Sequence, residues 1–173
     1  YRDLSLSTCP GDYDFLAVAD VVGGDVYPSD NSGQSAFKVL SKIHSAGVTG
    51  ITVPSEVDLD EEFSATVTVT NKGGFDETVS LNTVINPLAG ITGTCGELPT
   101  QQVSLKVLAG KTATYTYKDL SVGSCSGPHE FVAEISGFTE SAGESTADNI
   151  LSKQFTVSKA RDVGNPGNSN PNN

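Results

Sequence analysis

Strict alternation of apolar and polar residues between Phe63 and Thr70 constrains the fold of this chain more than any other feature. One face of an extended chain would carry Phe63, Ala65, Val67 and Val69, and the other would carry Ser64, Thr66, Thr68 and Thr70. Successive side chains of a strand point to opposite faces, so this period of two predicts a half-buried antiparallel strand. The next residues, Asn71-Lys72-Gly73-Gly74, favour a chain reversal because asparagine and glycine tolerate positive φ.

The same period recurs along the chain, which makes the strand at Phe63 one of a set. Seven segments alternate in this way, at residues 37–43, 63–70, 76–85, 101–107, 112–117, 129–135 and 151–157. We interpret 37–43 as an edge strand protected by lysines, with a short helix ending at Gly47 as the alternative. In the last segment, Lys153 would share the apolar face with Phe155 and Val157. Seven short strands without a long helical pattern predict an all-β protein, an immunoglobulin-like antiparallel β-sandwich.

The residues outside this pattern are predicted to be extensions. We expect an N-terminal extension at residues 1–35, the sandwich at 36–158 and a tail rich in Pro, Gly and Asn at 159–173. The extension contains an apolar run, Asp14–Val22, whose secondary structure is ambiguous because short apolar runs have no diagnostic period. The tail has little apolar surface to bury, so we expect it to have no fixed structure in an isolated monomer.

Four motifs occur in a recognisable order. They are PSEVDLDEEFSATVTVTNKG, VSLKVLAGKTATYTY, GPHEFVAEI and ESTADNILSKQFTV, and the most specific pieces are Asn71-Lys72-Gly73 and Leu108–Ala113. In this order they resemble the CARDB family, an immunoglobulin-like module of bacterial and archaeal cell-surface proteins. The chain departs from the family pattern at Ala109, where a proline is usual, and in the inserted PLAGITGTCGELPT. The resemblance implies extracellular adhesion or scaffolding, and no enzymatic reaction.

Charge and composition exclude several kinds of partner. With 21 acidic and 10 basic residues the net charge is −11, which opposes binding to nucleic acid or to anionic lipid. No apolar run approaches the roughly 18 to 20 residues that span a bilayer, so we expect no membrane insertion of the mature chain. The chain has no Met and begins at Tyr1. We therefore expect a processed chain or a fragment, secreted by means of a removed signal peptide and located outside the cell or at its surface.

The chain contains three cysteines, an odd number. Cys95 and Cys125 both lie in turn-like sequence within the strand-rich region, and we predict a disulfide between them. Cys9 is then left over, either as a free or buried thiol or as half of an interchain bond.

One acidic loop is a candidate metal site. Oxygen-rich loops bind calcium, and such a loop would present Asp58, Asp60, Glu61 and Glu62. The alternative is a solvated acidic loop, because the spacing does not match an EF-hand loop. His44 and His129 stand apart from recognised motifs, so both are predicted to be surface or turn histidines. No other cofactor and no catalytic constellation is indicated.

The functional hypothesis concerns the N-terminal extension. An exposed sheet edge can accept a strand from another molecule, and alternate side chains of that strand then fill pockets. A suitable pattern occurs in the predicted donor strand, Asp3, Leu4, Ser5, Leu6, Ser7 and Thr8. We expect a structural subunit that polymerises head-to-tail with copies of itself into an extracellular filament or pilus-like assembly. The alternatives are a strand paired within its own chain, and a monomeric adhesion or spacer module stiffened by calcium.

Overall fold

The computed structural model describes residues 10–19, 31–95 and 98–159, and these residues form strands without any helix. The strands are β1 (Gly11–Val18), β2 (Ser32–Val39), β3 (Ala46–Thr52), β4 (Glu56–Asp58), β5 (Phe63–Asn71), β6 (Glu77–Pro87), β7 (Thr92–Gly93), β8 (Thr100–Val107), β9 (Thr112–Leu120), β10 (Cys125–Ser136) and β11 (Ile150–Ser158). The all-β prediction is confirmed.

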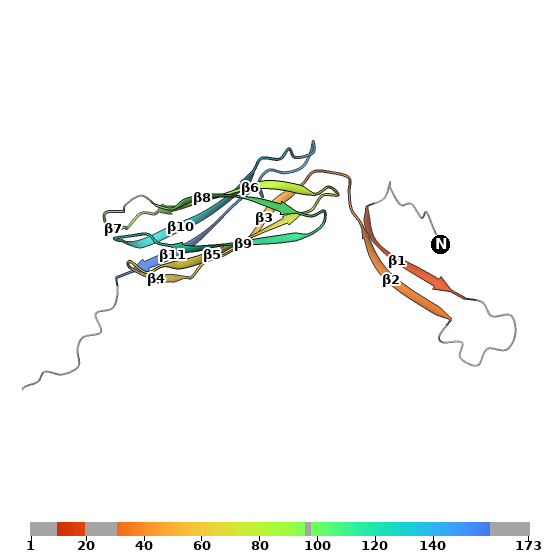
Figure 1. Ribbon diagram of the computed structural model, residues 1–173, viewed down its shortest axis with the longest axis horizontal. Helices are drawn as coiled ribbons and strands as arrows, with labels where there is room; N and C mark the ends of the chain where they lie inside the picture. Colours follow the sequence, from red (N-terminus) through yellow and green to blue (C-terminus); the bar gives the residue numbers. More distant parts are fainter. Residues whose placement is uncertain (1–9, 20–30, 96–97, 160–173) are drawn as a thin grey trace, which may run out of the picture.

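Strands β3 to β11 form a sandwich of two sheets (Figure 1). One sheet has the order β4-β11-β10-β6-β8, with β7 also paired to β10, and the other has the order β3-β5-β9. Neighbouring strands are antiparallel except for β4 and β11, which run parallel. The chain therefore pairs with the smaller sheet in β3 and crosses to the larger sheet in β4.

The alternation in β5 buries one face of the strand and leaves the other towards solvent, as predicted. Its apolar residues are buried and its hydroxyl residues are partly or fully exposed. On the outer face, Thr66 Oγ1 lies 2.9 Å from Thr116 Oγ1, and Thr70 Oγ1 lies 3.1 Å from Thr112 Oγ1. Cross-strand threonine pairs of this kind stabilise a sheet by about 0.2 to 1 kcal/mol each. The hydroxyl row thus faces water and also ties β5 to β9.

The core lies between the two sheets and is built from the inward residues of the alternating segments. Tyr117 is central, because its ring packs on Phe131 with centroids 6.2 Å apart and its hydroxyl donates to the Leu81 carbonyl oxygen at 3.4 Å. Burying one such large side chain contributes roughly 1.5 to 3 kcal/mol. The core is completed by residues from most strands of the sandwich, among them Val48, Val67, Val69, Val79, Ile85, Val107, Ala133, Ile135, Phe155 and Val157.

The first strand predicted for the sandwich, at residues 37–43, does not belong to it. Residues 32–39 form β2, which pairs with β1, and the first strand within the sandwich is β3. The helix considered as an alternative for residues 37–43 is absent. Lys153, the charged residue on the apolar face of β11, is exposed and precedes the stretch of β11 that pairs with β4.

Candidate functional site

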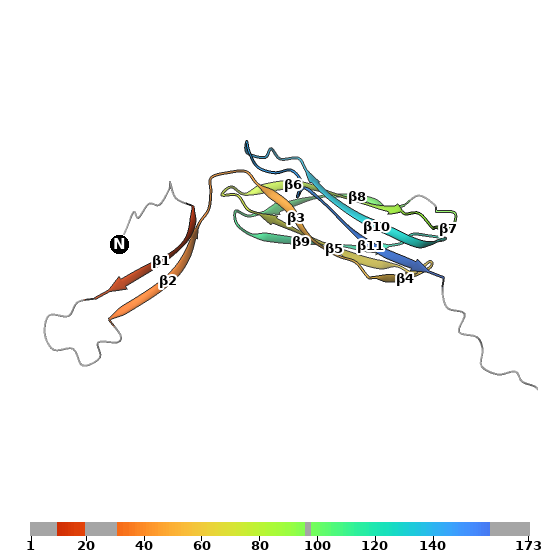
Figure 2. The same ribbon diagram turned by 180° about the vertical axis from the view of Figure 1, so that it is seen from behind.

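Strands β1 and β2 form an antiparallel hairpin that projects from one end of the sandwich (Figures 1 and 2). Their register runs from Gly11 opposite Val39 to Val18 opposite Ser32. An isolated two-stranded hairpin is at best marginally stable in water, because it has no second layer against which to bury apolar side chains. The hairpin is therefore the part of the described chain that most needs a partner.

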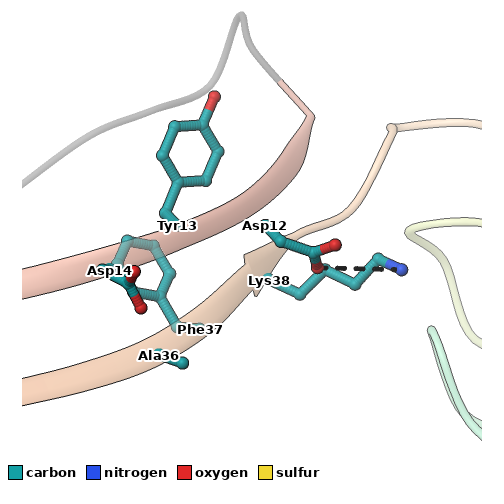
Figure 3. Close-up of a pocket in the computed structure, with 6 residues that line it drawn as sticks. All are labelled: Asp12, Tyr13, Asp14, Ala36, Phe37 and Lys38. Carbon is teal, nitrogen blue, oxygen red and sulfur yellow. Dashed lines mark ion pairs between the residues drawn. The ribbon is translucent and has the colours of Figure 1, made fainter.

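The hairpin carries apolar side chains on both faces. Tyr13 lies opposite Phe37, and their rings stack with centroids 5.8 Å apart and planes inclined by 23° (Figure 3). Phe37 nevertheless remains 43% exposed, and Leu16 on the other face is 62% exposed. Contiguous exposed apolar surface on a soluble protein usually marks an interaction site.

Charges flank this aromatic pair on the hairpin. Lys38 Nζ lies 4.0 Å from Asp12 Oδ1 across the two strands, and both side chains are well exposed (Figure 3). An ion pair of this kind contributes little stability because water screens it. An open hollow of about 390 Å³ on the hairpin is lined by Asp12, Tyr13, Asp14, Ala36, Phe37 and Lys38. Its shallow form suits a flat partner, such as another strand, better than a small molecule.

A linker, residues 40–45, joins the hairpin to the sandwich and lies on the β5–β6 turn. The Lys72 amide donates to the Ser45 carbonyl oxygen at 2.9 Å, and the Gly74 amide donates to the Ile43 carbonyl oxygen at 3.1 Å. A Cβ at Gly73 would overlap the Ile43 carbonyl oxygen. The expected reason for the glycines was therefore wrong: Gly73 and Gly74 are not at positive φ, and they are needed because the linker backbone approaches them closely.

His44 attaches the linker further. Its Nδ1 lies 2.7 Å from Oε1 of the buried Glu77, and its ring stacks on Phe75 with centroids 4.6 Å apart. The His44 backbone amide donates to Ser141 Oγ at 2.8 Å, and the Ser141 amide donates to the His44 carbonyl oxygen at 2.9 Å. These contacts hold the linker from two sides, so the hairpin leaves the sandwich in a defined direction.

The residues first assigned to strand donation, Asp3–Thr8, lie outside the described residues, as does Cys9. Whether that segment pairs with its own sheet or with another molecule therefore stays a prediction. The structure describes the element that follows this segment, the hairpin of β1 and β2. The sequence predicted only part of this hairpin. The apolar run at 14–22 was recognised, but its pairing with residues 32–39 depends on contacts that no local pattern encodes.

The predicted disulfide joins Cys95 and Cys125, with Cα atoms 4.8 Å apart. It lies beside His129, whose Nε2 is 3.2 Å from Cys125 Sγ and whose Nδ1 is 3.0 Å from the Gly127 carbonyl oxygen. The prediction of a surface position for His129 was wrong, since the ring is fully buried and stacks on Phe155. His129 lies two residues before Phe131 in β10, so both side chains point to the same, inward face, and this spacing could have predicted the burial of His129.

A metal site needs several ligand atoms that converge on one point. In the described part of the chain, the only group of three or more His, Cys, Asp or Glu side chains that gathers its ligand atoms is Cys95, Cys125 and His129, all within 4.8 Å. The disulfide occupies both sulfurs, so this group is not a metal site in the oxidised protein. Asp58 is the last residue of β4, whereas Asp60, Glu61 and Glu62 lie in the turn between β4 and β5, and none of the four is part of this group. Calcium binding there stays a prediction.

A second acidic pair, Glu140 and Asp148, lies in the β10–β11 loop. Burial, followed by the neighbouring Asp148 carboxylate, raises the pKa of Glu140 above its ordinary value. Lys72 Nζ lies 2.5 Å from Asp148 Oδ2, which links this loop to the turn beneath the linker. No sequence pattern points to this pair, because its two members come together only when the loop folds back.

Comparisons with known proteins agree with this architecture. The fold is that of an immunoglobulin-like β-sandwich domain. A crystal structure of the CARDB domain of a Pyrococcus furiosus protein, in complex with di-metal ions, matches 70% of this chain and 100% of that chain with a TM-score of 0.55 and 15% identity. The solution structure of the same domain matches 66% of this chain and 96% of that chain, with a TM-score of 0.49 and 16% identity. The chain thus has a CARDB-like fold, which confirms the resemblance at that level.

More distant similarity extends to part of an enzyme. A β-glucosidase from Listeria innocua matches 66% of this chain but only 16% of its own length, with a TM-score of 0.46 and 12% identity. No family model matches the sequence, and the search of curated proteins found no match. In the part of the chain that the structure describes, no helix is long and apolar enough to cross a membrane.

Proposed function

We propose that this protein is a structural subunit of an extracellular filament or pilus-like surface assembly, in which an N-terminal β element of one copy pairs with the sheet of the next. The observation that carries the proposal is the hairpin of β1 and β2. It exposes apolar side chains on a two-stranded ribbon that projects from a sandwich with its own core. An element that the sandwich does not need for folding, yet which cannot bury its own surface, is suited to binding another molecule.

Head-to-tail geometry follows from the position of the hairpin. It lies at one end of the sandwich, and the contacts of the linker with Gly73 and Gly74, together with that of His44 with Glu77, direct it away from the body (Figures 1 and 2). A contact between a projecting arm and a different surface of the next copy is heterologous, so it continues into a filament unless the rotation closes a ring. The disulfide suits the oxidising environment outside a cell.

The second candidate is a monomeric adhesion or spacer module of a cell-surface protein. Its support is the complete sandwich, together with the likeness to a CARDB domain solved with metal ions. In this case calcium could stiffen the loop that contains Asp58 and Glu62, and the hairpin would contact another part of the same surface protein.

Solution assembly separates the two candidates. Size-exclusion chromatography with light scattering, followed by negative-stain electron microscopy, should show oligomers and fibres whose size grows with protein concentration. The double variant Phe15→Asp with Phe37→Asp should remain monomeric, because two carboxylates cannot be buried in an apolar contact. Ile150→Asp is the control, since Ile150 is an apolar residue of the sandwich that is 52% exposed, against 37% for Phe15 and 43% for Phe37. A wild-type chain that stays monomeric at all concentrations excludes the subunit function and favours the spacer.

A separate truncation addresses the segment predicted first. Removal of residues 1–8 leaves the whole hairpin in place. If assembly is lost, the segment Asp3–Thr8 is itself a donor. If fibres form normally, the hairpin is sufficient and the contribution of Asp3–Thr8 is excluded.

A further inference from the structure

The sandwich has four outer strand edges on which another strand could pair, and they differ in how well they are protected. The β3 edge is interrupted by a bulge between Val48 and Gly50, and the Val48 amide already donates to the Asp148 carbonyl oxygen at 2.7 Å. On the opposite side of the larger sheet from β8, the outer strand is the three-residue β4, which covers the last residues of β11, and the uncovered part of β11 carries the exposed Lys153 on its inward face. Bulges, short covering strands and inward-pointing charges are the devices by which proteins prevent pairing at an edge.

The β9 edge has no such protection over most of its length. It is the last strand of the three-stranded sheet. Its register with β5 is regular from Thr112 to Tyr117, and this run of six residues contains no charged side chain. The nearest charges in sequence are Lys111 and Lys118, which are exposed and have no ion-pair partner among the described residues.

The β8 edge has an equally long uncharged run, but the two-layer architecture favours β9. The larger sheet has more strands than the smaller one, so the smaller sheet does not fully cover the inward side chains of β8. Val103 and Leu105 pack against the core but stay only partly buried, and Tyr115 of β9 is 37% exposed although it has the inward parity. Strands added beyond β9 would cover these side chains, whereas strands added beyond β8 would expose a new inner face.

The hairpin fits this edge in length and in chemistry. The run Ser32–Phe37 of β2 is also six residues without a charge, whereas β1 carries Asp12 and Asp14. In register, Tyr13 and Phe37 share one face of the hairpin. Pairing β2 with β9 would place this aromatic face over the half-buried residues of β8 and would add two strands to the three-stranded sheet. The exposed Lys111 and Lys118 at the ends of β9 also favour an arm that carries exposed aspartates in a chain of net charge −11.

We propose that the open edge of β9 is the acceptor site of the assembly, and that its occupant is β2 of the hairpin of a second copy. The sheet β3-β5-β9 of one molecule continues into β2 and β1 of its neighbour. This inference rests on the proposed function, because it names the surface on which the projecting hairpin docks. It identifies main-chain pairing as the source of affinity and the aromatic face as the source of specificity.

A mixing experiment with full-length chains tests the acceptor. Tyr115→Lys introduces an inward charge at the acceptor edge and leaves the hairpin intact, whereas Phe15→Asp with Phe37→Asp disables the hairpin and leaves β9 intact. Each variant alone should be monomeric at concentrations where the wild type assembles. An equimolar mixture should give a heterodimer that does not extend, because one intact hairpin meets one intact edge.

Two further variants keep the test independent of folding defects. Thr114→Lys changes an exposed side chain of the same edge, so it should also block assembly while it preserves the thermal stability of the sandwich. Ser104→Lys makes the same change on the β8 edge and should assemble like the wild type.

Each outcome bears on a different statement. A heterodimer in the mixture, with monomers in each variant alone, supports the β9 acceptor. Normal fibres from both Tyr115→Lys and Thr114→Lys overturn it, and the proposed function survives if the hairpin variant still fails to assemble. Loss of assembly in Ser104→Lys but not in Thr114→Lys would move the acceptor to β8 and overturn the inference. A wild-type chain that never assembles removes the proposed function itself.

Discussion

Replacement of Asn71 by alanine is expected to destabilise the sandwich strongly, although the change removes only one small polar side chain. Asn71 is 1% exposed. Its Nδ2 donates to the carbonyl oxygens of Phe75 at 2.7 Å and Val107 at 3.0 Å, and its Oδ1 accepts from the Gly73 amide at 2.9 Å. Each such bond contributes about 1 kcal/mol net, and a buried group left without a partner costs more. Asn71→Ala should therefore lower the free energy of unfolding by about 3 kcal/mol.

The variant Asn71→Asp keeps the shape of the side chain but changes its hydrogen bonds, so it separates the contributions of the two to stability. An aspartate at this position can accept from Gly73, but its carboxylate would face the carbonyl oxygens of Phe75 and Val107. Burial and these oxygens raise the pKa of the new carboxyl in the folded state above the value near 4 of the unfolded chain. The folded variant then binds the proton more tightly, so its deficit relative to the wild type should be largest at pH 7 and should shrink as the pH falls towards 4.

Equilibrium urea unfolding, followed by circular dichroism at both pH values, measures these differences. Asn82→Ala is the matched control, because the Asn82 amide donates only to the exposed Ser136 hydroxyl at 3.2 Å. It should change stability by less than about 0.5 kcal/mol. A loss below about 1 kcal/mol for Asn71→Ala, or an Asn71→Asp deficit that does not depend on pH, would refute the assignment of these three bonds.

Three other perturbations have defined outcomes. Gly73→Ala should lower the free energy of unfolding by about 1 to 3 kcal/mol, because its Cβ displaces the linker backbone, and thermal denaturation measures the loss. Cys95→Ser with Cys125→Ser should cost about 3 to 4 kcal/mol, the loop entropy for a separation of 30 residues, as urea unfolding would show. Glu140→Gln should stabilise the protein at pH 7, and the gain should disappear in thermal scans below about pH 4.5, because burial and the Asp148 carboxylate raise the pKa of Glu140.

Controls and contrary results are available for each. Gly50→Ala places its Cβ at ordinary contact distance, 3.4 Å from Thr68 Cβ, and should have a much smaller effect than Gly73→Ala. The double serine variant should match the wild type under reducing conditions, and a persistent difference would assign the loss to packing instead. A Glu140→Gln gain that is constant with pH would show that the carboxylate charge is not its cause.

The central strands of the sandwich could be predicted because each carries its own periodicity. Apart from Asp76, which directly precedes β6, all residues of the predicted segments 76–85, 101–107, 112–117, 129–135 and 151–157 lie in strands β6 and β8 to β11. The disulfide partners also followed from their places in turns of one region. By contrast, β3 and β4 have short and irregular patterns, because the chain leaves one sheet for the other between Thr52 and Glu56.

The candidate site was foreseen only in outline. The sequence predicted that an N-terminal β segment binds another molecule, and named Asp3–Thr8 as that segment. The N-terminal element that the structure describes is instead the hairpin of β1 and β2. Residues 36–39 had the same alternation as the sandwich strands, and nothing local distinguished a strand of the core from a strand of the arm. The same limit applies to His129, whose burial depends on Phe155 from a strand distant in sequence.

The sequence by itself determined that the chain forms strands and which side of each strand is apolar, because a period of two is a property of neighbouring residues. Only the tertiary structure decided which strands pair, why Gly73 and Gly74 must lack side chains, and which edges stay open. Those properties depend on backbones that approach one another from distant parts of the chain, and the number of strands in the opposite sheet decides whether an inward residue such as Tyr115 is covered.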